Sequence, residues 1–492
     1  MAKKVKFKLD GREIEADEGR LVIDAAKDAG VDIPHYCYHP ALGNPGNCRM
    51  CIVEVAGAPK PQVSCRTGVR EGLDVKTSTD AVKRAQASAL ELHLVNHPLD
   101  CPVCDQSGEC GLQNYYMEIG QYQSAVREDK QHKDKRIEAG PHVMLDQERC
   151  ILCTRCTRFV DNVTQTHELG VFRRGHAERI ELTPGLILDN AYSGNVVDIC
   201  PVGALTDRDF RYKVRVWYLD QTDSICPGCA RGCNISVHTN TKRPWHNDGK
   251  RVARLKPRHN HEVNGYWMCD EGRYATGSLD VGRLGRVLRL TPQKQDVSWD
   301  AAASEIGAKL RDGGVAFVAS GMLSNEDWAA AKELFAGAKF YFSAEPDQVG
   351  EEDALLRRRE KVPNLKGAQA LGLVSGSFDE LAKDLESGKV RALYVVERDL
   401  AKIWGAERAR ALLSKAALRV FQGPNKVELS ESYDFRLPAT AYVEEEGHFT
   451  NFEGKVQAYA KALEPIGEAR PDWDIFALIA KAKSGAAAEV AA

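Results

Sequence analysis

Residues 149–159 read RCILCTRCTRF, and this stretch decides how the middle of the chain is expected to fold. Its three cysteines follow the spacing C-x2-C-x2-C, and a fourth lies in the remote pair Cys200-Pro201. A close run with a distant Cys-Pro is typical of a four-iron cluster site. One run predicts one cluster, and a zinc site is the alternative. This third set, in chain order, consists of Cys150, Cys153, Cys156 and Cys200.

The first set lies upstream, and its cysteines are spaced C-x10-C-x2-C-x13-C. Closely placed cysteines followed by a distant fourth are typical of plant-type two-iron sites. Gly43 and Gly46 in the loop let backbone N–H groups approach cluster sulfides, whose charge their hydrogen bonds offset. A zinc site is the alternative, although the sequence lacks the paired CxxC knuckles of a zinc ribbon. The first set consists of Cys37, Cys48, Cys51 and Cys65.

The second set has three cysteines close together and no spare cysteine nearby, so it needs a different fourth ligand. His97 precedes them in the spacing H-x3-C-x2-C-x5-C. An imidazole is neutral where a thiolate is anionic, so we expect it to raise the reduction potential, as histidine does in Rieske centres. A lone histidine is more often a surface or core residue, and His93, one turn earlier, is expected to be one. The second set consists of His97, Cys101, Cys104 and Cys110.

The fourth set is spaced C-x2-C-x3-C-x35-C and predicts another four-iron cluster, with a zinc knuckle as the alternative. Four sites with four ligands each use all 15 cysteines and His97. No cysteine remains for nucleophilic or redox-pair catalysis. The sequence therefore predicts one two-iron and three four-iron clusters. The fourth set consists of Cys226, Cys229, Cys233 and Cys269.

Composition narrows the class of protein. The 492 residues carry a net charge of -3 with mixed signs, which argues against a nucleic-acid or lipid surface. An odd number of cysteines, confined to residues 37–269, argues against a disulfide framework. We find no signal segment and no apolar run long enough for a membrane span, and we expect a cytoplasmic or equally reducing location. The sequence has neither a Walker A motif nor a GxGxxG motif after a strand, so we expect NADH to bind elsewhere.

Hydrophobic patterns predict the elements around these sets. Alternation at 5–9, a turn at Asp10-Gly11 and a helix over 21–29 indicate a β-grasp domain. A further helix is expected over 80–96. After Cys269, strands at 315–318, 392–396 and 419–421 and helices at 326–335 and 406–415 predict a parallel α/β sandwich.

Six stretches carry a resemblance to a known family. They make the chain similar, over Val5–Gly277, to the large iron–sulfur subunit (75 kDa, G subunit) of respiratory complex I, NADH–quinone oxidoreductase. The stretches are CYHPAL at 37–42, NCRMCIVEV at 47–55, NHPLDCPVCDQSGECGLQ at 96–113, RCILCTRCTRF at 149–159, DICPVGAL at 198–205 and WMCDEG at 267–272.

The resemblance implies a multidomain α+β chain and the same four ligand sets. The fourth centre is found in some bacterial members of the family. There it lies too far from the series of other clusters to carry most of the electron flow. Its domain is similar to the cluster domain of molybdenum formate dehydrogenases. Residues 446–457, EGHFTNFEGKVQ, resemble a strip of molybdopterin enzymes. Because the C-terminal domain is shorter than in most bacterial relatives, we expect a degenerate scaffold that binds no molybdopterin.

The expected domains follow from these stretches. They are a 2Fe-2S ferredoxin-type β-grasp domain at 1–78, a 4Fe-4S domain with one histidine and three cysteine ligands at 79–120, a ferredoxin-like 4Fe-4S domain at 140–215, a molybdopterin-oxidoreductase-type 4Fe-4S domain at 219–275, a shortened α/β molybdopterin-oxidoreductase-like domain at 276–480 and a disordered tail at 481–492.

The resemblance also implies a function without substrate chemistry of its own. Electrons would arrive from the flavin-bearing NADH subunit at the first set, pass to the third and then the second, and leave for quinone-side subunits. A 2Fe-2S subunit is a further expected partner, and the location would be peripheral, on the cytoplasmic face of the inner membrane. No flavin would be bound by this chain.

Other functions and roles stay open. The alternative is an iron–sulfur diaphorase subunit of an NAD-linked hydrogenase or formate dehydrogenase. A molybdenum catalytic subunit and an iron-only hydrogenase fit less well, because the C-terminal domain is short and no cysteine follows Cys269. Arg149, Arg155 and Arg158 either offset negative charge beside a cluster or are plain surface residues.

Overall fold

The structure is a computed structural model that describes residues 3–124 and 126–485. The chain forms two compact units, residues 1–218 and 219–492. No helix within the described ranges combines the length and the apolar character that crossing a bilayer requires.

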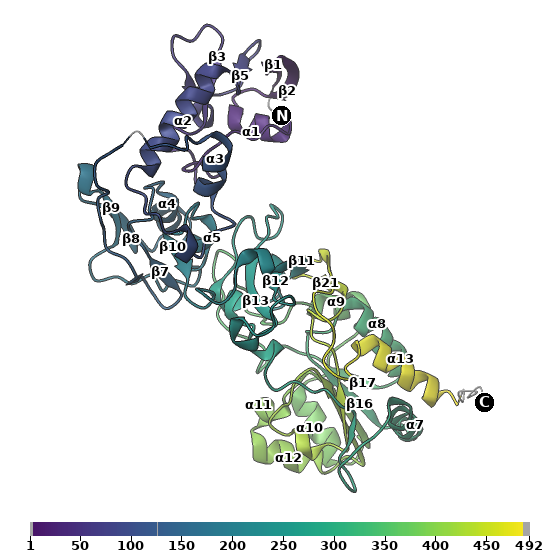
Figure 1. The fold of residues 1–492 in the computed structure, drawn as a ribbon. Coiled ribbons are helices and arrows are strands. Elements are labelled where there is room, and N and C mark those ends of the chain that lie inside the picture. Colours follow the sequence, from purple (N-terminus) through teal and green to yellow (C-terminus); the bar gives the residue numbers. More distant parts are fainter. Residues whose placement is uncertain (1–2, 125, 486–492) are drawn as a thin grey trace, which may run out of the picture. The chain divides into compact units, whose positions relative to one another are not determined.

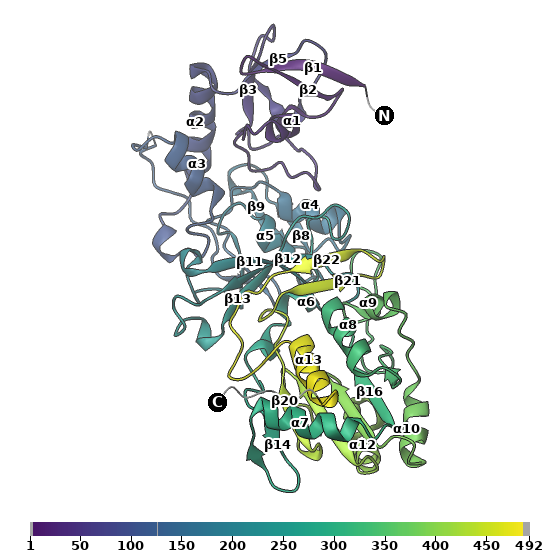
Figure 2. The same cartoon turned by 90° about the vertical axis from the view of Figure 1, so that its right-hand side faces the viewer.

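The first unit begins with a five-stranded sheet in the order β2-β1-β5-β3-β4. Figure 2 shows β1, β2, β3 and β5 of this sheet beside α1. In β1 every second side chain is buried and the lysines between them are exposed, so one face of the hairpin packs against α1. The hairpin and the helix were both predicted from the sequence and are confirmed. The elements are β1 (Lys4–Leu9), β2 (Arg12–Asp17), α1 (Val22–Asp28), β3 (Ile52–Val55), β4 (Gln62–Val63) and β5 (Asp74–Lys76).

The rest of the first unit is built from short elements around the second and third sets. Helix α2 begins where the Thr79 hydroxyl accepts a hydrogen bond from the Val82 N–H at 3.2 Å. Strands β10, β7 and β6 form a three-stranded antiparallel sheet, and β8 pairs with β9. The elements are α2 (Asp80–Leu94), α3 (Gly111–Ile119), β6 (Ile137–Glu138), β7 (Val143–Leu145), α4 (Arg155–Asn162), β8 (Leu169–Phe172), β9 (Arg179–Leu182), α5 (Asn195–Ile199) and β10 (Leu205–Asp207).

The second unit opens with an antiparallel meander, β11-β12-β13, followed by the short helix α6. The loop between β11 and β12 carries three cysteines of the fourth set, and Cys269 caps α6. A separate hairpin, β21-β22, lies near the end of the chain. These elements are β11 (Asp220–Ile225), β12 (Asn234–Thr239), β13 (Val252–Pro257), α6 (Asp270–Tyr274), β21 (Gly447–Thr450) and β22 (Val456–Tyr459).

A seven-stranded sheet in the order β15-β14-β20-β19-β18-β16-β17 forms the body of the second unit. The five strands from β20 to β17 are parallel, whereas β14 and β15 are antiparallel additions. All five residues of β18 are buried, as in a strand covered on both faces. The strands are β14 (Leu288–Arg289), β15 (Gln295–Asp296), β16 (Val315–Ala319), β17 (Lys339–Tyr341), β18 (Ala392–Val396), β19 (Leu418–Gly423) and β20 (Phe435–Pro438).

Helices cover both faces of this sheet, each over its own hydrophobic core (Figure 1). Residues of α7, α8, α9 and α13 belong to one core, and residues of α10, α11 and α12 belong to the other. The predicted α/β sandwich and the multidomain α+β class are confirmed. The helices are α7 (Trp299–Leu310), α8 (Asn325–Leu334), α9 (Leu365–Ala370), α10 (Phe378–Glu386), α11 (Leu400–Trp404), α12 (Ala406–Leu413) and α13 (Asp472–Lys483).

The last helix continues into the stretch that was expected to be a disordered tail. Residues 481–483 complete α13, and residues 486–492 lie outside the described part of the chain. The Arg311 guanidinium donates to the backbone oxygens of Ala482 and Lys483, and the Lys483 ammonium donates to the Leu334 oxygen at 2.9 Å. These contacts with the ends of α7 and α8 stabilise a helical end that the low-complexity sequence did not predict.

Candidate iron–sulfur sites

The four cysteines of the third set surround one small cavity. They line a space of about 20 Å³ together with apolar side chains such as Leu145 and Ile151. Burial and neighbouring thiols raise the pKa of Cys150 to about 12, and the same causes raise that of Cys153 to about 11. Such thiols ionise together only when cations compensate their charge, which the irons of a cluster do. The donor set therefore fits a cluster.

The sulfurs of the first set form two neighbouring pairs, Cys37 with Cys48 and Cys51 with Cys65. Hydrogen bonding within each pair lowers the pKa of Cys37 and of Cys51 and raises the pKa of the other member. All four side chains are buried. Two pairs of sulfurs suit a cluster that contains two irons.

Backbone and hydroxyl donors surround the first set. The N–H groups of Gly46 and Asn47 face the Cys37 sulfur and help to lower its pKa. Gly46 has a φ of +72°, where a side chain would be strained, and an added Cβ would lie 2.8 Å from Cδ of Arg66. The buried Ser64 hydroxyl faces the Cys51 sulfur and has no other partner within the described residues. Sequence reasoning missed Ser64, whose only signal is its place beside Cys65.

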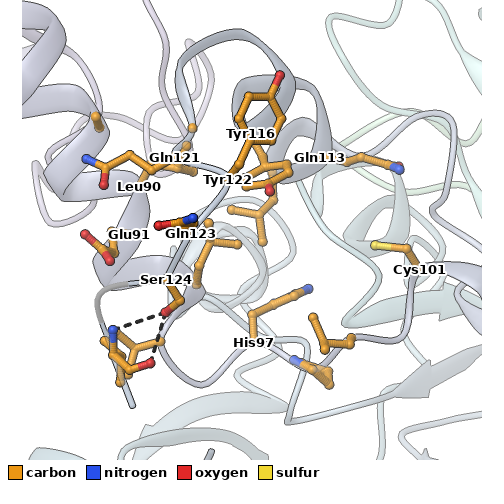
Figure 3. A pocket seen from close by; sticks show the side chains of 18 of the residues that line it. Leu90, Glu91, His97, Cys101, Gln113, Tyr116, Gln121, Tyr122, Gln123 and Ser124 are labelled. Carbon is orange, nitrogen blue, oxygen red and sulfur yellow. Dashed lines mark hydrogen bonds between the residues drawn. The ribbon is translucent and has the colours of Figure 1, made fainter. Parts of the chain in front are cut away.

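In the second set, His97 is the exceptional ligand candidate. Its Nδ1 atom is buried and makes no hydrogen bond within the described chain. Burial, and next the positive charge of Arg149, lower the pKa of His97 to about 4, so the ring is neutral and keeps a free nitrogen lone pair at neutral pH. His97, Cys101 and Cys110 line a cavity of about 500 Å³, and Figure 3 shows His97 and Cys101 on its wall.

Cys104 completes the second set. Its thiol interacts electrostatically with Cys101 and Cys110, and burial raises its pKa while Arg149 opposes that rise. A Cβ added at Gly203 would lie only 2.2 Å from the Cys104 sulfur. Gly203 follows Cys200 closely in the chain, so the Cys104 sulfur of the second set lies against the segment that carries Cys200 of the third.

His93 lies apart from the second set. Its Nε2 donates to the backbone oxygen of Cys48 at 3.0 Å, and its ring meets Tyr36 edge-on with centroids 5.2 Å apart. Tyr36 itself is fully buried and its charge interactions reach both Cys110 and Cys48. The ring of His93 therefore packs on Tyr36 and on the backbone of the first set, and it belongs to neither set.

The fourth set is held by a loop and a helix start in the second unit. The Cys226 N–H donates to the Cys233 oxygen at 2.8 Å and closes the loop. The Cys269 sulfur accepts from the Gly272 N–H at 3.4 Å, and a Cβ at Gly272 would lie 2.8 Å from the Cys226 sulfur. Burial raises the pKa of Cys226, and the nearby Cys269 and Cys229 raise it further. Gly272 thus brings helix α6 close to the Cys226 sulfur.

The strip at 446–457 packs directly on this loop. The Gln457 amide donates to the Gly232 oxygen at 2.9 Å and accepts from Asn234 at 2.6 Å. The Phe452 N–H donates to the Ala230 oxygen at 2.9 Å. The strip therefore supports the cysteine-bearing loop of the fourth set.

None of the three arginines is a plain surface residue. Arg149 is buried and pairs with Asp100 at 2.9 Å and with Asp146 at 3.3 Å. Arg155 and Arg158 are half-buried and donate to backbone oxygens.

Within the described ranges, no three His, Cys, Asp or Glu side chains are arranged to hold a single metal ion.

Protein-family models match five stretches of the chain. The chain therefore carries two-iron and four-iron cluster-binding domains and a molybdopterin-oxidoreductase domain. The models are "2Fe-2S iron-sulfur cluster binding domain" at 2–80, "NADH-ubiquinone oxidoreductase-G iron-sulfur binding region" at 86–124, "NADH-quinone oxidoreductase subunit 3, ferredoxin-like domain" at 140–206, "Molybdopterin oxidoreductase Fe4S4 domain" at 219–280 and "Molybdopterin oxidoreductase" at 349–482.

Curated relatives agree with these matches. The NADH-quinone oxidoreductase G subunit of Rickettsia conorii is 40% identical over 62% of this chain, but the match covers only 45% of that relative. The mitochondrial NADH-ubiquinone oxidoreductase 78 kDa subunit of Neurospora crassa is 40% identical over 61% of this chain and 40% of its own length. A solved chain of an NAD+-reducing [NiFe]-hydrogenase is 34% identical and covers 43% of this chain and 91% of that one, with a TM-score of 0.39.

A longer match extends into the second unit. The NADH-quinone oxidoreductase G subunit of Rickettsia felis is 30% identical to this chain, and the match covers 96% of this chain and 86% of that relative. The N-terminal resemblance seen in the sequence is thereby confirmed, and it extends to the C-terminal domain. The chain belongs to the family of NADH-quinone oxidoreductase G subunits.

Proposed function

We propose that this chain is an electron-transfer subunit of an NADH:quinone oxidoreductase, and that its sets hold one 2Fe-2S and three 4Fe-4S clusters. Bound clusters would supply one-electron redox chemistry, with potentials set by ligands, hydrogen bonds and burial. The observation that carries the proposal is that the segments bearing three of the ligand sets pack directly on one another within residues 1–218. The first set would hold the two-iron cluster, and the other sets would hold four-iron clusters.

Contacts between the sets support the order first, third, second. Asn47, next to Cys48, donates to the Leu152 oxygen at 3.1 Å and so joins the first set to the third. The Gly111 N–H, next to Cys110, donates to the Pro201 oxygen at 2.9 Å and joins the second set to the third. The third set thus lies against both others, as the middle site of a relay must, although Tyr36 also interacts with Cys48 of the first set and Cys110 of the second.

Residues around the second set would favour a higher potential. His97 is neutral, and the buried Arg149 places a positive charge near both His97 and Cys104. A neutral ligand and a nearby cation both stabilise the more negative, reduced state of a cluster. This arrangement suits a site that accepts electrons from the third set.

The fourth set would not be a member of this relay. It lies in the second unit, where the meander, α6 and the strip at 446–457 hold it. We propose that the molybdopterin-oxidoreductase domain acts as a scaffold for this set and binds no molybdopterin. The domain boundaries 1–78, 79–120, 140–215, 219–275 and 276–480 belong to the same proposal.

Partners and location follow from the same reasoning. The chain would receive electrons from a flavin-bearing, NADH-binding subunit and a 2Fe-2S subunit, and pass them to quinone-side subunits. It would lie on the cytoplasmic face of the membrane as a peripheral part of the complex. Neither flavin nor NAD would be bound by the chain itself.

Metal analysis of anaerobically purified chain tests the proposal. Full occupancy of one two-iron and three four-iron clusters requires about 14 irons and as many sulfides per chain. Zinc and molybdenum should both be missing. A colourless preparation, or zinc in place of iron, would refute the proposed clusters.

A further inference from the structure

Arg158 joins the loop of the first set to the loop of the third. Its Nη1 donates to the backbone oxygens of Leu42 at 2.6 Å and Gly43 at 3.1 Å. Its Nη2 donates to the oxygen of Cys37, a ligand candidate of the first set, and to the oxygen of Cys153 in the third, at 3.4 Å. One guanidinium therefore contacts backbone oxygens on both sides of the contact between the two sets.

Two neighbouring side chains reinforce the same contact. Arg155 donates to the Tyr38 oxygen at 2.5 Å through one Nη and to the Ile199 oxygen at 3.2 Å through the other. Asn47 donates to the Leu152 oxygen at 3.1 Å. Each of the three side chains lies within three residues of a ligand candidate, so each bond acts close to a sulfur.

We propose that Arg158 is a positioning residue that, with Arg155 and Asn47, fixes the distance between the first and third sets. The inference rests on the proposed function, because it concerns how far apart two centres are held. Electron transfer slows steeply as the distance between two centres grows. The hydrogen bonds of Arg158, Arg155 and Asn47, together called the joint, hold the two cluster-binding loops at a fixed distance. They therefore also determine the rate of electron transfer between the two centres.

The geometry requires an arginine. A guanidinium presents five donors in a rigid plane and contacts several carbonyls at once, whereas a lysine ammonium is a single compact charge. Lysine at this position would keep the positive charge but leave backbone oxygens on one side of the joint without a donor. Arg158→Lys therefore separates the positioning role from a purely electrostatic one.

The test uses the full chain with its clusters, prepared anaerobically, as wild type and as Arg158→Lys. Low-temperature electron spin resonance of the reduced protein measures the magnetic interaction between the first and third centres, which falls with the cube of their distance. Redox titration measures their potentials, and amide hydrogen exchange follows the loop at 38–47. Arg208→Lys is the matched control, because Arg208 also donates to a backbone oxygen, that of Gly140 at 2.9 Å, away from the first set.

The expected result is a variant with full iron content and unchanged potentials, but with a weakened magnetic interaction and faster exchange at 38–47. The control should match wild type. A wild-type interaction in a fully loaded Arg158→Lys protein would overturn the inference, as would shifted potentials with an unchanged interaction, or loss of the third cluster alone.

A milder variant guards against misfolding. If Arg158→Lys is insoluble, Asn47→Ala takes its place in the test. This variant removes one bond of the same joint and should weaken the magnetic interaction to a smaller degree. An unchanged magnetic interaction in Asn47→Ala would count against the inference. A wild-type chain without iron would instead refute the proposed function, so the two failures are distinguishable.

Discussion

Gly203→Ala should remove the cluster of the second set. The added Cβ would lie 2.2 Å from the Cys104 sulfur and 3.3 Å from the Gln106 Cβ. An ordinary contact needs ~3.5 Å, so the sulfur would have to retreat by about 1.3 Å. Gly203 does not have a positive φ, so alanine strains no backbone there and the effect is the collision alone.

The size of the effect depends on whether Cys104 is a ligand. If it is, a displacement of this size moves one of four donors out of coordination, and about four of the 14 irons are lost with the second-centre spin signal. If it is not, overpacking lowers the free energy of unfolding by ~1–3 kcal/mol and leaves the clusters intact.

Iron and sulfide analysis with low-temperature spin resonance measures the outcome. Gly111→Ala is the matched control, because it lies beside Cys110 but its added Cβ would make only ordinary contacts of 3.5 Å and longer. A Gly203→Ala protein that keeps its full iron content and an unchanged second-centre signal would show that the reasoning about Cys104 is wrong.

Three further predictions test other parts of the molecule. His97→Cys should keep the second cluster and lower its potential in a redox titration; an unchanged potential would remove His97 from the ligands. Gln457→Ala leaves the Gly232 oxygen without its donor. It should broaden only the spin signal of the fourth centre and lower the free energy of unfolding by ~1–3 kcal/mol. A sharp fourth-centre signal with wild-type stability would contradict this prediction. Burial, and then Glu445, raise the pKa of Glu397 to about 8. The folded carboxyl therefore holds a proton that the unfolded chain releases near pH 4.5, and stability falls as pH rises from there toward 8. Glu397→Gln should flatten this fall in urea unfolding series, and an equally steep fall would contradict the assignment.

Elements with a strong local pattern could be predicted from the sequence. Strand 392–396 has a run of five apolar residues, and in the structure it is β18, buried on both faces. The alternation at 5–9 predicted the first hairpin for a similar reason, because its side chains segregate by face. Ligand spacing likewise predicts the four sets, since cysteines at these spacings have few other uses, and their role as ligands stays a prediction.

What joins the sets could not be predicted. The acceptors of Arg158 are backbone oxygens of residues such as Leu42 and Gly43, and every residue type carries such an oxygen. Their usefulness depends on which loops the fold brings together. Gly203 is similar: its value lies in the missing Cβ beside Cys104, a contact between segments far apart in the chain.

The strip at 446–457 uses its polar side chains to hold the loop of the fourth set, as the proposed scaffold role requires. The Asn451 side-chain oxygen accepts from the N–H groups of Glu453 and Lys455, and its amide nitrogen donates to the Arg231 oxygen. The Gln457 amide donates and accepts toward the loop of the fourth set. Polar groups engaged in this way are not available to a second ligand without breaking the support of that loop. The side chains of Asn451 and Gln457 are thus already used in holding the loop of the fourth set, which favours the scaffold role.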